Sequence, residues 1–103
     1  MVQRIIWTRK ALADLREIHD YIARDSPRYA QIQVERIQSS ALKIARFPEV
    51  GRILPEFSDG PWREILTGNY RVIYRWDSGS GQGLILAVVH GRQLLNPTMI
   101  GPG

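Results

Sequence analysis

The sequence predicts an α+β fold of the order β-α-α-β-β-β, in which an N-terminal strand and a two-helix hairpin pack on a mainly antiparallel sheet. Two observations predict this fold. Apolar residues recur at intervals of three and four over residues 9–46, interrupted only around Asp25-Ser26-Pro27. Beyond Pro61 the period becomes two, which is the spacing of strands that bury one face. A chain of 103 residues has the length of one small domain, which we expect over residues 1–103.

The first half of the chain is expected to form a strand and two helices. Residues 2–7 are rich in β-branched and aromatic side chains, which predicts a short strand. Thr8 stands where a cap would precede a helix over residues 9–24, and Ser26 stands where a cap would precede a helix over residues 27–46. Because the turn between the two amphipathic helices is so short, they must form a hairpin.

The second half is expected to hold a loop and three strands. Residues 48–61 contain three prolines, two glycines and no sustained period, which predicts an ordered surface loop. Strands are predicted at residues 62–66, 70–76 and 84–90, joined by turns that make neighbours antiparallel. Residues 96–103, with two prolines and two glycines, are expected to form a flexible tail.

Composition limits the classes of function. The chain has no cysteine and no apolar run long enough to span a bilayer, so we expect a cytoplasmic protein without disulfides and without a membrane partner. The spacing of His, Asp and Glu is not that of a metal site and no phosphate-binding glycine loop is present, so neither metal nor cofactor is expected. Fourteen basic residues, twelve of them arginine, face ten acidic residues and give a net charge of +4. Such a charge fits nucleic acid or an acidic protein surface, or no specific partner at all.

The strand at residues 70–76 carries the first candidate site. Alternation places Arg71, Ile73 and Arg75 on one face and the aromatic residues on the other. We expect the aromatic face to lie under the helical hairpin and the arginine face to point outward, with Arg63 beside it if the strand register permits. These arginines are candidate ligands for phosphates or acidic side chains. The alternative is that they only solvate an exposed face and discourage unwanted strand pairing.

The segment His90-Gly91-Arg92, directly after the last apolar strand, is the second candidate site. A histidine there can act as a general acid or base near neutral pH, and an arginine beside it can hold an anion. RNA cleavage without a metal requires a base, cations for the phosphate and an acid for the leaving group. The candidates for these roles are His90, Arg71, Arg92 and either Glu49 or Glu64. The alternative is a histidine satisfied by hydrogen bonds at a strand end.

Taken together, these segments resemble the RelE/ParE family of toxins from type II toxin–antitoxin systems along nearly the whole chain. The most specific parts are Arg63-Glu64-Ile65-Leu66 through Arg75, and Val88-Val89-His90-Gly91-Arg92. The resemblance implies an α+β fold and a toxin that is neutralised by a cognate antitoxin. It also implies autoregulation of the pair, with operator DNA contacted only through the antitoxin.

The family divides into two chemistries. RelE-like members cleave messenger RNA on the ribosome, whereas ParE-like members inhibit DNA gyrase. Arg71 matches the middle-strand arginine of the nuclease branch, and Arg92 or Gln93 matches its arginine after the last strand, but Met99 lies near the place of its tyrosine. The pattern Arg-Glu-x-Leu-x-Gly-x-Tyr, which here begins at Arg63, is closer to the ParE-like branch.

The resemblance therefore favours a gyrase inhibitor, which requires no catalytic residues, and leaves a ribosome-dependent mRNA endonuclease that works without a metal as the alternative. A regulatory partner without toxicity is a third possibility. For the endonuclease, the expected catalytic residues are Arg71, His90 and Arg92. The residues expected to bind the target or an anion are Arg63, Arg71, Arg75 and Arg92.

Overall fold

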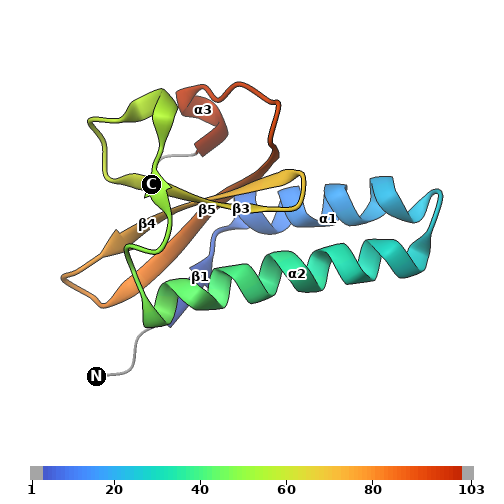
Figure 1. The fold of residues 1–103 in the computed structure, drawn as a ribbon, viewed down its shortest axis with the longest axis horizontal. Helices are drawn as coiled ribbons and strands as arrows, with labels where there is room; N and C mark the ends of the chain where they lie inside the picture. Colours follow the sequence, from blue (N-terminus) through green and yellow to red (C-terminus); the bar gives the residue numbers. More distant parts are fainter. Residues whose placement is uncertain (1–3, 101–103) are drawn as a thin grey trace.

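A computed structural model describes residues 4–100 and contains the elements expected from the sequence, in the expected order (Figure 1). The helices are α1 (Arg9–Ala23), α2 (Pro27–Arg46) and a short α3 (Pro97–Ile100), with one 3-10 turn, η1 (Pro55–Phe57). The strands are β1 (Arg4–Trp7), β2 (Arg52–Ile53), β3 (Trp62–Thr67), β4 (Tyr70–Asp77) and β5 (Gln82–His90). Residues 2–3 of the expected first strand and residues 101–103 of the expected tail lie outside the described residues.

Both long helices begin at the residues expected to cap them. The Thr8 side chain accepts a hydrogen bond from the Ala11 N–H at 3.1 Å, and the Ser26 side chain accepts one from the Tyr29 N–H at 3.1 Å. The Thr8 hydroxyl also donates to the Ile85 carbonyl at 2.8 Å, which fixes the start of α1 against β5. Within residues 4–100, no helix is long and apolar enough to cross a membrane.

The strands form one five-stranded sheet in the order β1-β5-β4-β3-β2. β1 pairs in parallel with β5 and every other neighbouring pair is antiparallel, so the expected mainly antiparallel sheet is confirmed. The edge strand β2 was not expected, because residues 48–61 predict an irregular loop. A strand of two residues produces no alternation along the sequence, so a pattern of period two cannot reveal it.

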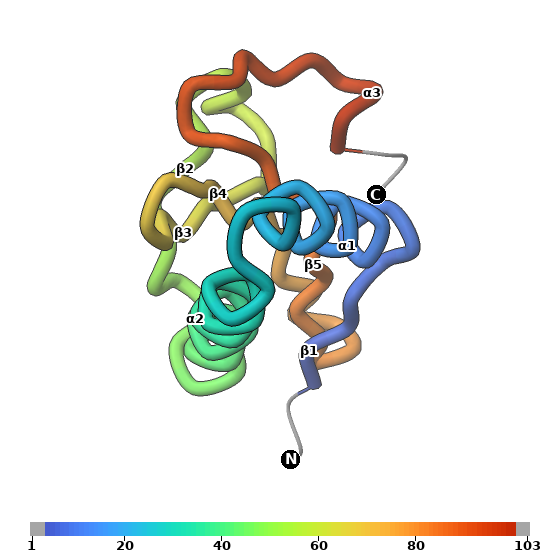
Figure 2. The backbone as a smooth tube through the Cα atoms, turned by 90° about the vertical axis from the view of Figure 1, so that its right-hand side faces the viewer, coloured from blue at the N-terminus to red at the C-terminus, as the bar shows by residue number. Residues whose placement is uncertain are grey.

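The sheet is covered on both faces, as two perpendicular views show (Figures 1 and 2). The helical hairpin covers one face, and η1 with the segment from the end of β5 to α3 covers the other. The core under the hairpin includes Leu15, Ile37, Ile44, Val72 and Tyr74, which confirms the expected direction of the aromatic face of β4. The second core, on the opposite face, is formed by Leu54, Ile73, Leu86, Ala87, Val89, Leu95 and Ile100.

This second core changes two expectations. Residues 96–103 were expected to trail off the fold, but Leu95 and Ile100 are buried in the second core, and Met99 packs against it. The arginine face of β4 was expected to point outward, but Arg71 is only 6% exposed and Ile73 is fully buried. The physical reason is the same in both cases. An apolar residue between two arginines requires a cover on that face, and the chain supplies one from its own loop and C-terminal segment.

Beyond Trp7 the edge of β5 is covered by α1 and not by a strand. β1 ends opposite Ile85, and from there the Val88 N–H donates to the Asp14 carboxylate at 3.0 Å. Lys10 holds the same carboxylate at 2.7 Å. This contact satisfies a backbone donor that would otherwise be buried without a partner.

Tyr74 holds the loop after α2 against the sheet. Its side chain is fully buried, and its hydroxyl donates to the Pro48 carbonyl at 2.7 Å and accepts from the Gly51 N–H at 2.9 Å. A Cβ on residue 51 would lie 2.7 Å from the Tyr74 ring, so glycine is required for this close approach. Burial also raises the pKa of Tyr74.

We predict that Tyr74→Phe lowers the free energy of unfolding by about 1–3 kcal/mol, because it leaves a buried carbonyl and a buried N–H without their partner. Urea unfolding followed by tryptophan fluorescence measures the difference. Tyr21→Phe removes the same hydroxyl from a side chain that is 69% exposed, and should change stability by less than about 0.5 kcal/mol. Equal effects of the two substitutions would contradict the anchoring role of the Tyr74 hydroxyl.

Candidate functional site

Arg71, His90 and Arg92 line one open pocket of about 460 Å³ beside the turn between β3 and β4. Antiparallel pairing of β4 with β5 sets Tyr70 opposite His90, and this register brings the two candidate segments of the sequence together. The other residues that line the pocket are Arg52, Pro55, Glu56, Leu66, Gly68, Asn69, Tyr70 and Gly91.

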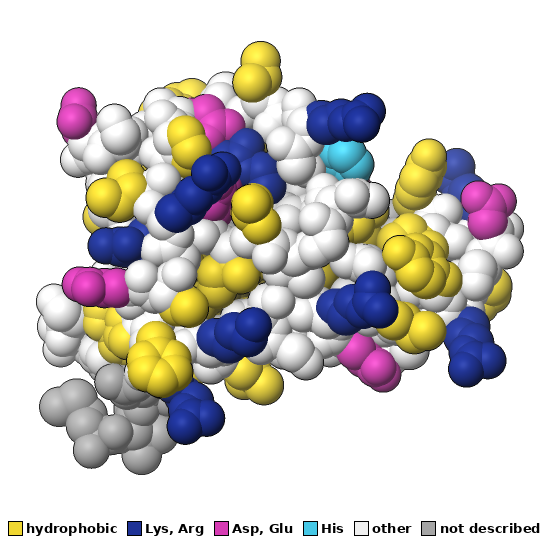
Figure 3. Space-filling view, in the orientation of Figure 1, with side chains coloured by type: hydrophobic (Ala, Val, Ile, Leu, Met, Phe, Trp, Pro, Cys, Tyr) yellow, Lys and Arg dark blue, Asp and Glu magenta, His cyan; other side chains and the backbone are white. Residues whose placement is uncertain are grey.

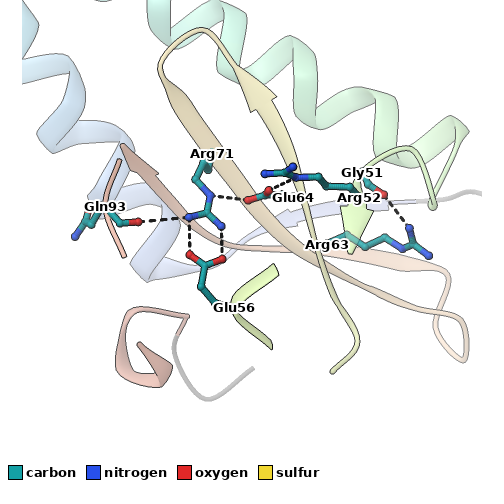
Figure 4. Close-up of polar contacts among 7 residues, drawn as sticks. All are labelled: Gly51, Arg52, Glu56, Arg63, Glu64, Arg71 and Gln93. Carbon is teal, nitrogen blue, oxygen red and sulfur yellow. Dashed lines mark hydrogen bonds and ion pairs between the residues drawn. The ribbon is translucent and has the colours of Figure 1, made fainter. Parts of the chain in front are cut away.

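The guanidinium of Arg71 forms the floor of this pocket and is held by two carboxylates (Figure 4). Its Nη1 and Nη2 donate to the two oxygens of Glu56 at 2.7 and 2.6 Å, and its Nε donates to Glu64 at 2.5 Å. A longer hydrogen bond of 3.4 Å joins Nη1 to the Gln93 carbonyl. The planar fork of arginine matches a carboxylate in this two-bond geometry. Glu56 therefore occupies the place on Arg71 where the anionic group of a ligand would bind.

Glu64 connects Arg71 to a second arginine. Its side chain has no exposed surface, and its other carboxylate oxygen accepts from the Nε of Arg52 (Figure 4). Arg52, Glu64, Arg71 and Glu56 thus form a row of alternating charges, called here the charge row. Its two positive and two negative charges cancel. Pairing permits the burial of Glu64 and Arg71, since an unpaired ion in this environment would be costly, whereas Arg52 at the end of the row is exposed.

The pairing also sets the protonation of the charge row. Hydrogen bonds from Arg71 lower the pKa of Glu56, although burial acts in the opposite direction. Hydrogen bonds to Glu56 and to Glu64 raise the pKa of Arg71. Both groups therefore remain charged at neutral pH, and Arg71 neither gives nor takes a proton there.

Arg63 lies on the other face of the sheet. It is the cross-strand partner of Tyr74, whose side chain faces the hairpin. Its Nη1 donates to the Gly51 carbonyl at 2.8 Å, away from Arg71 (Figure 4). Because successive residues of a strand alternate between faces, the neighbour of Glu64 cannot share the face of Glu64.

Arg75 is also absent from the pocket that contains Arg71. It is partly buried and pairs across the sheet with Trp62, and its Nε has no hydrogen-bond partner within the described part of the chain. The expectation of a single outward cationic face formed by Arg63, Arg71 and Arg75 is therefore wrong. Strand alternation separates Arg63 from the others, and the second core covers Arg71.

His90 and Arg92 stand at the exposed rim of the pocket. The backbone N–H of Arg92 donates to the Nδ1 of His90 at 3.2 Å, which leaves the proton of a neutral imidazole on Nε2. In this arrangement the neutral His90 can donate a hydrogen bond from Nε2, but it is neither a general base, because its lone pair is occupied, nor a general acid, because that role needs the imidazolium. The Tyr70 ring lies edge-on to the imidazole, with 5.7 Å between the ring centres.

The two carboxylates named as candidates for RNA cleavage, Glu49 and Glu64, do not accompany His90 at the rim. Glu49 lines a different hollow near the end of α2, and Glu64 is committed to the charge row. Sequence reasoning missed Glu56 and Arg52, because neither lies in a stretch with a period. Tyr70 packs against the core under the hairpin as expected, but its side chain is only partly buried and also borders the pocket, which sequence reasoning did not foresee. Among residues 4–100, no group of three His, Asp or Glu residues is placed to hold a metal ion.

We predict that Glu56→Gln lowers the free energy of unfolding by about 2 kcal/mol at neutral pH, because a charged double hydrogen bond to Arg71 is lost. The pKa of Glu56 is lowered in the folded chain, so its stabilisation is complete above the ordinary value of 4.5. That stabilisation is lost as the pH falls from there through the folded value. The difference between wild type and variant should therefore shrink below about pH 4.5.

Urea unfolding at a series of pH values between neutral and strongly acidic tests this. Glu49→Gln is the matched control, because Glu49 is exposed and has no salt bridge within residues 4–100. A difference between wild type and Glu56→Gln that stays constant over the acidic range would show that the charge of Glu56 does not stabilise the fold.

The chain is similar to known toxins in sequence and in structure. It is 44% identical over 50 residues to Toxin RelE2 of Caulobacter vibrioides, a match that spans 48% of this chain and 57% of that protein's length. The toxin–antitoxin complex RelBE2 from Mycobacterium tuberculosis gives a TM-score of 0.61 at 26% identity, over 87% of this chain and 99% of that one.

Two solved structures of lower sequence identity confirm the α+β fold. A chain of the chromosomal ParDE system from P. aeruginosa gives a TM-score of 0.68 at 22% identity, over 86% of this chain and 96% of that one. A mutant of the E. coli toxin RelE in the free state gives 0.63 at 14% identity, over 89% of this chain and 86% of that one.

The family relationship rests on a match along most of the chain. The model of the family described as the ParE toxin of type II toxin–antitoxin systems, parDE, matches residues 5–95. This range contains the charge row and the pocket residues of β4 and β5, and it confirms the resemblance carried by Arg63-Glu64 and His90-Gly91-Arg92. The chain therefore belongs to the ParE toxin family of type II toxin–antitoxin systems, within the RelE/ParE toxins.

Proposed function

We propose that this toxin arrests growth by binding a protein target, DNA gyrase, and not by cleaving RNA. The observation that carries the proposal is the state of Arg71. It is buried and paired with two carboxylates, so it offers no free positive charge to a scissile phosphate. A toxin that acts by occupying its target needs no such charge.

The residues that resemble the ParE-like pattern are explained by the fold without catalysis. Glu64 and Arg71 lie on neighbouring strands and contact each other, and Gly68 adopts a positive φ of 59° in the turn between those strands. Together they tie β3 to β4. The pattern can therefore be retained by a protein that performs no chemistry, which supports the branch that inhibits gyrase.

We also propose that a cognate antitoxin neutralises the chain. Two of the similar solved structures are a ParDE system and a RelBE2 toxin–antitoxin complex. On this proposal, operator DNA is recognised by the antitoxin of the pair.

The second candidate function is a ribosome-dependent mRNA endonuclease. It is favoured by the meeting of Arg71, His90 and Arg92 in one pocket, and by the name of the relative Toxin RelE2. This function would require Glu56 to release Arg71 when RNA enters, and His90 to give up its contact with the Arg92 N–H.

We predict that the purified chain blocks DNA supercoiling by gyrase at a small molar excess, because it would occupy the enzyme directly. Agarose-gel analysis of plasmid topology measures the effect. Relaxation of the same plasmid by topoisomerase I is the control and should continue at equal toxin concentrations. Unimpaired gyrase at a large excess of toxin, or equal inhibition of both enzymes, would overturn the proposal.

A second prediction concerns messenger RNA in cells. Induction of the toxin without its antitoxin should arrest growth while translated messages remain intact, as mapping of RNA 5′ ends can show. New discrete ends in translated regions would favour the endonuclease if they disappear in both His90→Ala and Arg92→Ala. These side chains are exposed, so the two variants are expected to fold, which circular dichroism can verify.

A further inference from the structure

The net positive charge of the chain is concentrated on one helix. α2 contains four basic residues and a single acidic one, Glu35, whereas α1 contains three of each. α2 therefore carries a charge of +3, while the whole chain has +4. The four basic residues of α2, called here the basic stripe, are all exposed: Arg28, Arg36, Lys43 and Arg46.

The spacing of these residues places them on one side of the helix. At about 100° per residue, positions 28, 36, 43 and 46 fall within an arc of about 80°. They span about 27 Å along the axis, at about 1.5 Å per residue. This arc lies nearer to the side of α2 that meets β3 than to the side that meets α1, because Ser40 on the β3 side accepts a hydrogen bond from Thr67 of β3 at 2.7 Å. The positive charge is therefore turned away from the mixed charges of α1.

A hollow lies along the middle of the basic stripe. It has a volume of about 390 Å³ and lies between α2 and the end of β3, with Arg36 and Lys43 on its lining. Ser39 and Ser40 line it as well, and each has a hydroxyl hydrogen that can be donated to an anionic oxygen, whereas the Thr67 hydroxyl already donates to Ser40. In the space-filling view of this face, dark blue side chains recur along the row over α2, and magenta ones are fewer (Figure 3).

From this surface we infer that the toxin itself binds the phosphate backbone of duplex DNA through the basic stripe. A row of cations with hydroxyl donors between them matches a row of phosphates. The length of the stripe corresponds to about 8 base pairs at about 3.4 Å per step. Exposed aromatic side chains, Tyr29 and Phe47, lie only at the two ends of the stripe, and none lies between Arg36 and Lys43 where an unpaired base could stack beside the hollow, so a duplex fits the middle of the stripe better than a single strand.

This contact is separate from the pocket and from the proposed action on gyrase. No residue of the basic stripe belongs to the charge row or lines the pocket of Arg71. The toxin itself would contact DNA through the basic stripe, in addition to any contact that operator DNA makes with an antitoxin. Because only phosphates are contacted, binding should depend strongly on salt and little on base sequence.

The test is fluorescence anisotropy of a labelled duplex of about 20 base pairs, titrated with the toxin over a range of salt concentrations. In Arg36→Glu/Lys43→Glu the dissociation constant should rise at least about tenfold, and the slope of log affinity against log salt should fall by about two. The control is Arg9→Glu/Arg16→Glu, on exposed positions of α1, which changes the net charge by the same amount. It should weaken binding by less than about threefold.

The neutral pair Arg36→Gln/Lys43→Gln provides a second variant of the stripe with little risk to the helix, and it should show an intermediate loss. Thermal unfolding of all variants checks the fold. Equal losses in the α1 and α2 charge reversals would overturn the inference, because only net charge would then matter. Absence of DNA binding by the wild type at low salt, or tighter binding of a single-stranded RNA of equal length, would overturn it too. Failure to inhibit gyrase would leave it standing.

Discussion

The constraint on which the rest of the structure depends is the pairing of four charges, of which Glu64 and Arg71 are buried, Glu56 is partly buried and Arg52 is exposed. Each comes from a different segment: β2, β3, β4 and η1. Removing one partner would leave a charge in low-dielectric surroundings, which costs about 3–5 kcal/mol when no partner replaces it. The loop after α2 is therefore ordered by electrostatics as much as by apolar contact, and its Leu54 then contributes to the second core. The charge row therefore joins β2 and η1 to the centre of the sheet and forms one side of the pocket.

The elements with local signals could be predicted from the sequence. Thr8 and Ser26 cap helices because their side chains contact the chain three residues later, and such a signal is contained in a short window. The cover of the second sheet face could not be predicted, because it depends on Glu56 meeting Arg71, a pair separated by fifteen residues in a stretch without a period. Arg71 itself was identified as a site residue, but its burial was not. One-dimensional alternation shows which residues share a face, and says nothing of what lies over that face.

The pocket shows how two proteins of one family can share a fold and an arginine position and still differ in the ligand that the arginine binds. A buried arginine that satisfies two carboxylates maintains the fold, whereas the same arginine with a free guanidinium would bind phosphate. The difference between these two roles is one residue, Glu56, on a 3-10 turn of three residues. The residues of β3, β4 and the end of β5 thus identify the toxin family. The loop that carries Glu56 determines whether Arg71 binds a carboxylate of the chain itself or is free to bind a phosphate. Loops vary more readily than strands, so targets can diverge while the sheet is retained.

The cover of the β5 edge by α1 has a consequence for the chain before it meets any partner. Asp14 and Thr8 occupy backbone groups of β5 that a neighbouring strand would otherwise take. If the N-terminal strand and helix detached together, a long apolar strand would present an open edge, which is a template for pairing with another copy. Residues 4–23 therefore cover an edge that would otherwise be open to pairing with another copy of the chain. Selection on this segment would then reflect resistance to aggregation, and substitutions there could abolish toxicity without touching a target surface.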